Sequence, residues 1–266
     1  MTQAIRVAIN GASGRMGRAL LALLREDRRF ALTRAVVAEG SEQDGASVFG
    51  GLSYTHNWEG ALATDVVIDF SGPDGLASAL TYCIANKVAL VTGTTGIESS
   101  LEAQVAAASK QIPVLQAANF SLGVAVLTRL LREAAAALPN WDLEIIESHH
   151  NRKEDAPSGT ALALGHAAAD ARGTTLAKDG VYVREGRPGA RREGTIGFAV
   201  VRGGDVVGEH TALVLGQGER VELSHRATDR SIFARGALEA AAWLAGRKPG
   251  AYSIDDMLQD RGRKPG

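Results

Sequence analysis

Short, mostly apolar runs alternate with helical patterns through the first 120 residues of the chain. The apolar runs predict strands at residues 5–10, 31–38, 66–70, 88–92 and 112–116. Between them, alanine- and leucine-rich segments with helical spacing predict helices around residues 15–25, 73–85 and 98–108. Strands that are apolar throughout and separated by helices are typical of a parallel sheet covered on both faces. We therefore expect residues 1–120 to form a Rossmann-like, doubly wound α/β domain of the kind that binds dinucleotides.

The pattern changes after residue 120, and a second domain is expected at residues 121–230. A long apolar helix is predicted at 124–138, a strand at 143–146 and a helix at 159–171. Residues 174–193 are rich in Gly and Arg, which predicts a loop with a short strand at 181–184. Strands at 195–201, 207–215 and 220–227 follow, joined by tight glycine turns that predict antiparallel neighbours. This indicates an α+β domain with a mixed, largely antiparallel sheet.

The C-terminal segment, residues 231–266, is expected to contribute an amphipathic helix at about 232–245. Periodicity alone does not decide whether this helix packs back on the first domain. The polar stretch from residue 260 to the end is expected to fray.

Composition narrows the class of protein. With a formal net charge of −1 and 22% charged residues, nothing in the chain as a whole attracts nucleic acid or an anionic membrane. No apolar run reaches the roughly 18 residues that a membrane span needs, and the first residues lack the organisation of a signal peptide. A cytoplasmic location is the default expectation. The single cysteine, Cys83, lies in an apolar helical pattern and is expected in the core.

A glycine-rich loop follows the first predicted strand and opens the first helix. Its sequence is Gly11-Ala12-Ser13-Gly14-Arg15-Met16-Gly17. Gly11 permits a tight turn, Gly14 lets the backbone approach a pyrophosphate, and Gly17 lets helix and strand pack closely. The spacing departs from the commonest fingerprint because Ser13 stands where a second glycine is usual. These glycines can also serve only to shape a turn, but their place after the first strand favours cofactor binding.

Further cofactor contacts are expected where later strands end. Glu39, after the second strand, is a candidate for the adenosine ribose, or alternatively a solvated loop residue. No arginine follows directly, although Arg15 and Arg34 remain candidates for a 2′-phosphate, so NADH and NADPH both stay open. Phe120 can cover a nicotinamide face or simply pack between domains. The other candidates at these strand ends are Gly93, Thr94, Thr95, Ala117, Ala118 and Asn119.

The segment from Glu147 to Thr160 gathers titratable groups. His149 and His150 lie at the end of a predicted strand, where adjacent side chains point to opposite sides, so we expect different roles for them. Histidine exchanges protons near neutral pH, and a lysine such as Lys153 in a partly enclosed cleft can act as a proton donor. A metal site using the histidines and Asp155 is disfavoured by the ligand spacing and by the charge of the lysine.

A helix is expected to begin directly after these groups, at Ser158-Gly159-Thr160. Ser158 is the expected N-cap, and the N–H groups of the first turn attract anions such as a carboxylate. The alternative is a plain helix cap. Because Gly159 comes so soon after two histidines and a lysine, anion binding is favoured.

These motifs, taken together and in this order along the chain, resemble the dihydrodipicolinate reductase family of bacterial lysine and diaminopimelate synthesis, also called 4-hydroxy-tetrahydrodipicolinate reductases. The block of two histidines, Lys153 and Asp-Ala-Pro-Ser-Gly-Thr is the most specific part. The match extends over nearly the whole chain and comprises residues 11–17, 68–70, 93–96, 118–121, 147–150, 153, 155–161, 194–198 and 208–211.

The resemblance implies an NADH- or NADPH-dependent reduction of a dicarboxylate substrate. His149 would be the catalytic histidine and Lys153 the proton donor, while His150, together with Ser158, Gly159 and Thr160, would hold the substrate carboxylates. The cofactor would lie along residues 11–16, 93–95 and 117–120. Residues 121–230 would bind substrate and form a homotetramer through their sheets, and the last helix would return to the first domain.

The chain departs from the family pattern at two places that bear on cofactor choice. Many members carry an acidic residue followed by an arginine at the end of the second strand, where this chain has Val37 and Ala38 with Glu39 just after. The stretch 71–73 also lacks an arginine often found beside its proline.

Two other functions are compatible with parts of the sequence. Another NAD(P)-dependent dehydrogenase of amino-acid metabolism would share the first domain but not the histidine and lysine block. A regulatory module that binds NAD(P) without turnover has no use for a proton donor, so the combination of His149 and Lys153 argues against it.

Overall fold

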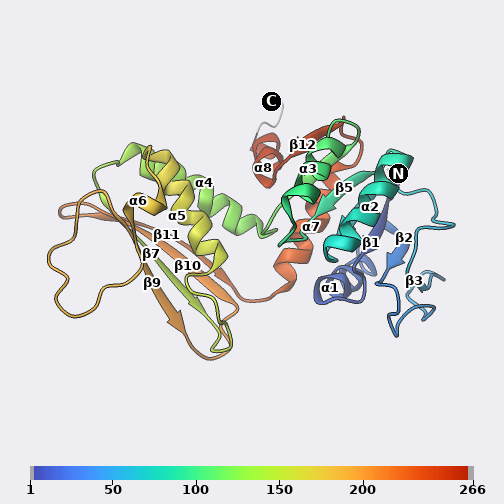
Figure 1. The fold of residues 1–266 in the computed structure, drawn as a ribbon, viewed down its shortest axis with the longest axis horizontal. Helices are drawn as coiled ribbons and strands as arrows, with labels where there is room; N and C mark the ends of the chain where they lie inside the picture. Colours follow the sequence, from blue (N-terminus) through green and yellow to red (C-terminus); the bar gives the residue numbers. More distant parts are fainter. Residues whose placement is uncertain (1–2, 263–266) are drawn as a thin grey trace. The chain divides into compact units, whose positions relative to one another are not determined.

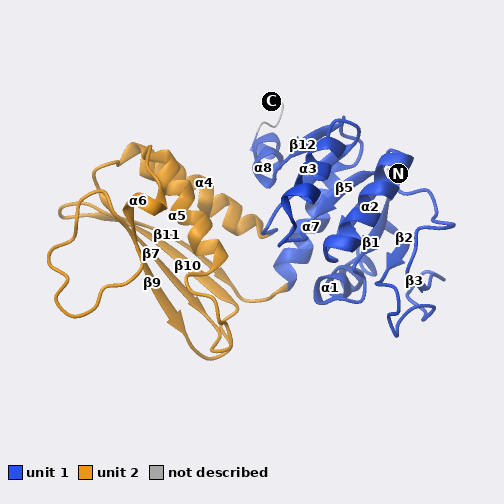
Figure 2. Cartoon of the chain, in the orientation of Figure 1, with its two compact units in different colours: residues 1–120, 231–266 blue, residues 121–230 orange. Residues whose placement is uncertain are grey.

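The computed structural model describes residues 3–262 and divides the chain into two compact units, coloured separately in Figure 2. Unit 1 runs to Phe120 and resumes at Ser231, whereas unit 2 comprises residues 121–230. Each unit contains its own sheet, as Figure 1 shows. Among the described residues, no helix has the length and apolar character that crossing a bilayer requires.

Unit 1 is built on a seven-stranded sheet whose pairings are all parallel, in the order β12-β6-β5-β4-β1-β2-β3. Because strands β1, β4 and β5 are apolar on both sides, helices cover both of their faces. The elements are β1 (Ile5–Asn10), α1 (Arg15–Leu24), β2 (Phe30–Val36), β3 (Tyr54–Thr55), β4 (Val66–Asp69), α2 (Pro73–Asn86), β5 (Ala89–Thr92), α3 (Ser99–Ala108), β6 (Pro113–Gln116), α7 (Ser231–Leu244), β12 (Gly250–Tyr252) and α8 (Ile254–Gly262).

The predicted doubly wound sheet is confirmed. The apolar residues that predicted its strands and helices pack together in its core. Helices α2 and α3 pack their apolar faces against the strands, and Cys83 is fully buried there, as expected. Burial raises the pKa of its thiol well above the ordinary value. On the chain's return, α7 contacts α1 and strands β4 and β5.

The short elements β3, β12 and α8 were not predicted. Two of them are strands of two or three residues at the sheet edges, too short to show a period. The expectation of fraying from residue 260 is wrong for residues 260–262, which belong to α8; the remaining residues of that stretch lie outside the described part.

Unit 2 is a mixed five-stranded sheet in the order β11-β10-β7-β9-β8, with helices α4 and α5 packed on one face. Its pairings are antiparallel for β10 with β11 and with β7, but parallel for β7 with β9 and β8 with β9. The sheet is therefore mixed, with less antiparallel character than expected. The elements are α4 (Leu122–Ala137), β7 (Asp142–His149), α5 (Gly159–Ala171), α6 (Leu176–Asp179), β8 (Gly180–Val181), β9 (Ile196–Arg202), β10 (Gly208–Leu215) and β11 (Arg220–Ala227).

One predicted pairing is wrong: β9 and β10 are not neighbours, because β7 lies between them. Their glycine connection passes over the end of β7, where Gly203 N donates to the carbonyl of His149 at 2.9 Å and Asn151 N donates to that of Gly204 at 3.2 Å. The tight glycine turn therefore joins two strands that are not neighbours and hydrogen-bonds to the strand between them. The short strand expected at residues 181–184 lies instead at Gly180–Val181, preceded by α6.

Candidate active site

The glycine loop of unit 1 follows β1, next to the point where the strand order reverses between β1 and β4. Gly11 has a φ of +79°, and a Cβ added there would lie 2.4 Å from the carbonyl oxygen of Phe70. A Cβ on Gly17 would lie 2.3 Å from the carbonyl oxygen of Gly11. Gly14 caps α1 without a side-chain hydrogen bond. Close packing therefore requires glycine at positions 11 and 17. Because no side chain caps α1, the N–H groups of its first turn are available to bind an anion.

Two hollows adjoin this loop at the carboxyl edge of the sheet. The larger has a volume of about 720 Å³, a normal size for a ligand pocket, and is lined by the loop, by residues 36–39 after β2 and by residues 70–75. The smaller brings Arg15 and Met16 together with residues 93–95 and also borders Phe70 and Ser71. The structure therefore brings the glycine loop, Glu39 and residues 93–95 to one edge.

The other predicted cofactor residues have different surroundings. Ala12 is fully buried, and its N–H donates to Val36 O at 2.8 Å. Residues 117–119 follow β6, where Ala117 N donates to Thr92 O, but they line neither of the two described hollows. The ring of Phe120 is 2% exposed and meets Phe70 edge-on, so its side chain packs in the interior.

A buried carboxylate holds the loops of this edge together. Asp69, at the end of β4, accepts hydrogen bonds from Asn10 Nδ2 at 2.8 Å and from Ser71 Oγ at 2.5 Å. Its other oxygen accepts from the hydroxyls of Thr92 and Thr94, both at 2.7 Å. Four donors from the ends of β1, β4 and β5 satisfy a side chain that is fully buried. The shape of the edge thus depends on Asp69.

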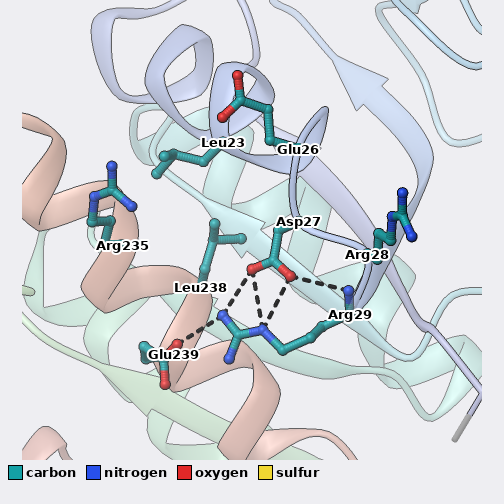
Figure 3. A pocket seen from close by; sticks show the side chains of 8 residues that line it. All are labelled: Leu23, Glu26, Asp27, Arg28, Arg29, Arg235, Leu238 and Glu239. Atoms are coloured by element: carbon teal, nitrogen blue, oxygen red, sulfur yellow. Dashed lines mark hydrogen bonds and ion pairs between the residues drawn. The ribbon is translucent and has the colours of Figure 1, made fainter.

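Another hollow of unit 1, shown in Figure 3, lies at the opposite edge of the sheet. It is formed by residues 26–29, which precede β2, and by α7. Ligands of open parallel sheets bind at the carboxyl ends of the strands, not at this amino end. The guanidinium of Arg29 is paired with both Asp27, at 2.7 Å, and Glu239, at 2.8 Å. We regard this hollow as a structural ion-pair cluster.

In unit 2 the strand register places four polar side chains on one face of the sheet. Glu147 and His149 are two residues apart on β7, so both point to the face that α4 and α5 cover. His210 of β10 is paired with Glu147, and Arg202 of β9 with His149. Paired residues of neighbouring strands project to the same side. The four groups therefore meet at one end of the sheet.

Glu147 is the centre of this cluster. Its fully buried carboxylate accepts from His149 Nδ1 at 2.5 Å, from both terminal nitrogens of Arg202 at 2.9 Å, and from Ser158 N at 2.9 Å. Burial by itself would raise the pKa of this carboxyl, but the donors, Arg202 foremost, more than offset burial and lower it. The side chain is therefore an anion at neutral pH.

Helix α5 begins after Ser158, as expected, and its start lies beside Glu147. Ser158 is the N-cap, and its Oγ accepts from Ala161 N at 3.2 Å and lies 3.1 Å from His210 Nε2. Ser158 is 2% exposed with its polar atoms occupied, so it supports the helix start. Gly159 has open space where a Cβ would stand. A ligand can approach the backbone of the first turn at that residue.

Lys153 and His150 lie in the turn after β7. The ammonium of Lys153 donates to both oxygens of Asp155, at 2.6 and 2.7 Å, and lowers the pKa of that carboxyl. Arg202 donates to the carbonyl of Asp155 at 2.7 Å, which links this turn to the Glu147 cluster. The pKa of His150 is lowered by partial burial and by neighbouring cations, Arg230 first among them.

Comparison with known proteins assigns the chain to a family. The model for the N-terminus of dihydrodipicolinate reductase matches residues 5–120, and that for its C-terminus matches residues 123–258. The 4-hydroxy-tetrahydrodipicolinate reductase of Thiobacillus denitrificans is 48% identical over 96% of this chain and 98% of its own. That of Rhizobium meliloti is 44% identical over 96% and 97%.

The chain belongs to the dihydrodipicolinate reductase family. Its fold is similar to that of the dipicolinate-bound dihydrodipicolinate reductase of Paenisporosarcina sp. TG-14, with a TM-score of 0.78 at 24% identity over 94% of this chain and 98% of that one. The diaminopimelate dehydrogenase of C. glutamicum shares the fold more distantly, with a TM-score of 0.53 at 14% identity over 99% of this chain and 100% of that one.

The sequence alone gave no role to three residues of the cluster in this reductase: Glu147, Arg202 and His210. One local signal was available for Glu147: it lies two residues before His149 at the end of the same predicted strand, and residues two apart on a strand share a face. The other two come from strands whose pairing with β7 was not predicted.

His210 makes the stability of this reductase sensitive to acid. Burial, with the charge of His149 a smaller cause, lowers its pKa from 6.5 to about 4. Between pH 6.5 and pH 4, His210 is protonated more readily in the unfolded chain than in the folded protein. The free energy of unfolding therefore decreases as the pH falls from 6.5 towards 4. Between pH 7 and 5 the loss from this residue is about 2 kcal/mol.

We expect His210→Gln to lose less unfolding free energy than the wild type between pH 7 and 5, as measured by urea titration. His166→Gln, at an exposed position, is the control and should behave as the wild type. Equal pH dependence in His210→Gln and the wild type would contradict the assignment.

Proposed function

We propose that the chain catalyses the NAD(P)H-dependent reduction of 4-hydroxy-tetrahydrodipicolinate to tetrahydrodipicolinate with loss of water, in cytoplasmic lysine and diaminopimelate biosynthesis. Full-length relatives at 44–48% identity carry that name. The observation that supports it best is that one carboxylate, Glu147, binds both a histidine and the start of a helix. A proton donor and an anion site thereby come together, and the reduction of a dicarboxylate needs both.

The cofactor residues are proposed in unit 1. The tight glycine backbone and uncapped start of α1 fit a pyrophosphate along residues 11–16, because an added Cβ would close the turn. Residues 93–95 and the backbone of residues 117–120 would contact the nicotinamide half. When bound, the cofactor supplies the hydride.

The substrate residues are proposed in unit 2. The backbone of Gly159 and Thr160 would bind one carboxylate at the start of α5, and His150 would assist, while Ser158 holds the helix start in place. The structural relative from Paenisporosarcina has dipicolinate bound, and dipicolinate is a dicarboxylate like the proposed substrate.

Proton transfer is proposed for His149 and Lys153. Loss of water from the substrate gives a conjugated cyclic imine, hydride arrives at C4, and the resulting enamine carbon takes a proton. Hydride and proton together add the two hydrogens of the product. Lys153, with its ammonium held by Asp155, and His149, held by Glu147, are the groups that can deliver this proton.

Purified protein should oxidise NADH or NADPH when it is supplied with the product of dihydrodipicolinate synthase. His149→Gln and Lys153→Met should each lower kcat by about 10²–10⁴-fold, since each removes a proton-transfer group, with cofactor affinity retained. His166→Gln is the matched control and should keep wild-type turnover. Absence of cofactor oxidation with this substrate would sink the assignment, and oxidation with a different amino-acid substrate would favour another dehydrogenase.

We further propose that NADH is the preferred cofactor. None of the residues described as lining the larger hollow is a lysine or arginine, and one of them is Glu39. The guanidinium of Arg34 is occupied by Asn57 and by the carbonyl of Glu59. Arg15 borders the smaller hollow instead. A 2′-phosphate would therefore meet a carboxylate without a compensating arginine fork.

The ratio of kcat/KM for NADH over NADPH should exceed about 10, which corresponds to about 1.4 kcal/mol. Glu39→Gln should lower this ratio by relieving the repulsion of the 2′-phosphate, and Glu39→Arg should lower it further. Glu42→Gln, an exposed change outside the hollow, should leave it unaltered. A wild-type ratio below 1 would refute the preference.

A homotetramer built through unit 2 is also proposed. The sheet face opposite α4 and α5 carries apolar side chains that the helices leave uncovered, among them Ile146, Leu213 and Val201, the last 50% exposed. Apolar sheet faces of this kind are typical of subunit interfaces.

Light scattering after size exclusion should give about four times 27.8 kDa. Ile146→Glu, which introduces a charge into this face, should lower that mass, whereas Val126→Glu on the exposed side of α4 should not. A monomeric wild-type protein would contradict the proposal.

A further inference from the structure

Glu147 contacts His149 and the backbone of Ser158 from inside the protein rather than from its surface. Its side chain is fully buried, and both carboxylate oxygens are used: one accepts from His149 Nδ1 and Arg202, the other from Arg202 and Ser158 N. A buried anion is tolerated only with such complete pairing, because an unpaired one is costly. The charge is therefore matched by donors from His149, Arg202 and the backbone of Ser158.

The contact to His149 defines which nitrogen of the ring carries the proton in the neutral form. A carboxylate 2.5 Å from Nδ1 requires the hydrogen on Nδ1, which leaves Nε2 as the nitrogen that exchanges a proton. Beside Nε2 lies Gly208, where an added Cβ would stand 3.0 Å from that nitrogen. Glycine thus keeps the exchanging nitrogen uncrowded.

The contact to Ser158 N fixes the start of α5. It anchors the residue immediately before Gly159, whose first-turn backbone is the proposed carboxylate site. A single carboxylate therefore sets the position of the proton-transferring ring relative to the anion site.

Arg202 resolves the conflict that this arrangement creates. A carboxylate next to an anion site would repel an anionic ligand, but Arg202 pairs with both of its oxygens and neutralises it. The same guanidinium donates to the carbonyl of Asp155, whose side chain holds Lys153. The pair thus connects both proposed proton donors.

We propose that Glu147 is a positioning residue that fixes the Nδ1–H tautomer of His149 and anchors the start of α5, with Arg202 neutralising its charge. The proposal rests on the function proposed above for His149. Neither the tautomer nor the binding of a dicarboxylate requires turnover, so both can be tested even if the reductase assignment fails.

The first test uses the wild-type protein. Solid-state ¹⁵N NMR of histidine-labelled protein, at a pH where imidazole is neutral, should show His149 with Nδ1 protonated and Nε2 unprotonated; the His149→Gln spectrum assigns the signal. Observation of the opposite tautomer would overturn the proposal without any variant of Glu147.

The second test compares Glu147→Gln with Glu144→Gln. Glu144 is a glutamate of the same strand that is also paired with arginines, Arg184 and Arg191, but points to the other face. We expect Glu147→Gln to lower kcat about 10²–10⁴-fold, as expected when an orienting carboxylate is lost, and to leave the KM for the nicotinamide cofactor within about threefold. It should also change the pH profile of kcat and weaken dipicolinate binding about tenfold. Glu144→Gln should match the wild type in kcat, in the KM for the cofactor, in the pH profile of kcat and in dipicolinate binding.

Glu147→Asp keeps the charge on a shorter side chain and should recover part of the lost kcat. Equal losses in Glu147→Gln and Glu144→Gln, or a Glu147→Gln enzyme with wild-type kcat and an unchanged pH profile, would overturn the proposal. If Glu147→Gln does not fold, the wild-type spectrum and the partial activity of Glu147→Asp still decide it.

Discussion

The candidate site depends on one buried carboxylate. Glu147 accepts hydrogen bonds from His149, Arg202 and Ser158 N, and these donors come from the end of β7, from β9 and from the start of α5. Leaving such a charge unpaired would cost several kcal/mol, so the three elements must keep their register. Asp69 has the corresponding place in unit 1, where four donors from three strand ends converge on it.

This constraint explains how ordinary elements form the proposed site. Helix starts, strand-end histidines and lysines occur in many proteins, but here the same carboxylate orients the ring of His149 and anchors Ser158 before Gly159. The charge that orients the ring would repel an anionic substrate if Arg202 did not neutralise it. The proposed chemistry depends on this balance of charges rather than on any single residue.

The sequence predicted what depends on local patterns. Apolar runs and helical periods identified the parallel sheet, and the glycine spacing identified the loop after β1, because short-range sterics and strand ends determine both. The cluster around Glu147 was not predictable in this way. Arg202 is 55 residues away from Glu147 and meets it only because β7 lies between β9 and β10, whereas the glycine turn at Gly203 suggested that those strands were neighbours.

A crystal structure of the protein with a nicotinamide cofactor and dipicolinate is the most direct test of the role of Glu147. We expect the cofactor pyrophosphate on the backbone of residues 11–16, a dipicolinate carboxylate on the backbone of Gly159 and Thr160, and Glu147 still bound to His149 Nδ1. A dicarboxylate bound away from the start of α5, or a His149 ring released from Glu147, would contradict it.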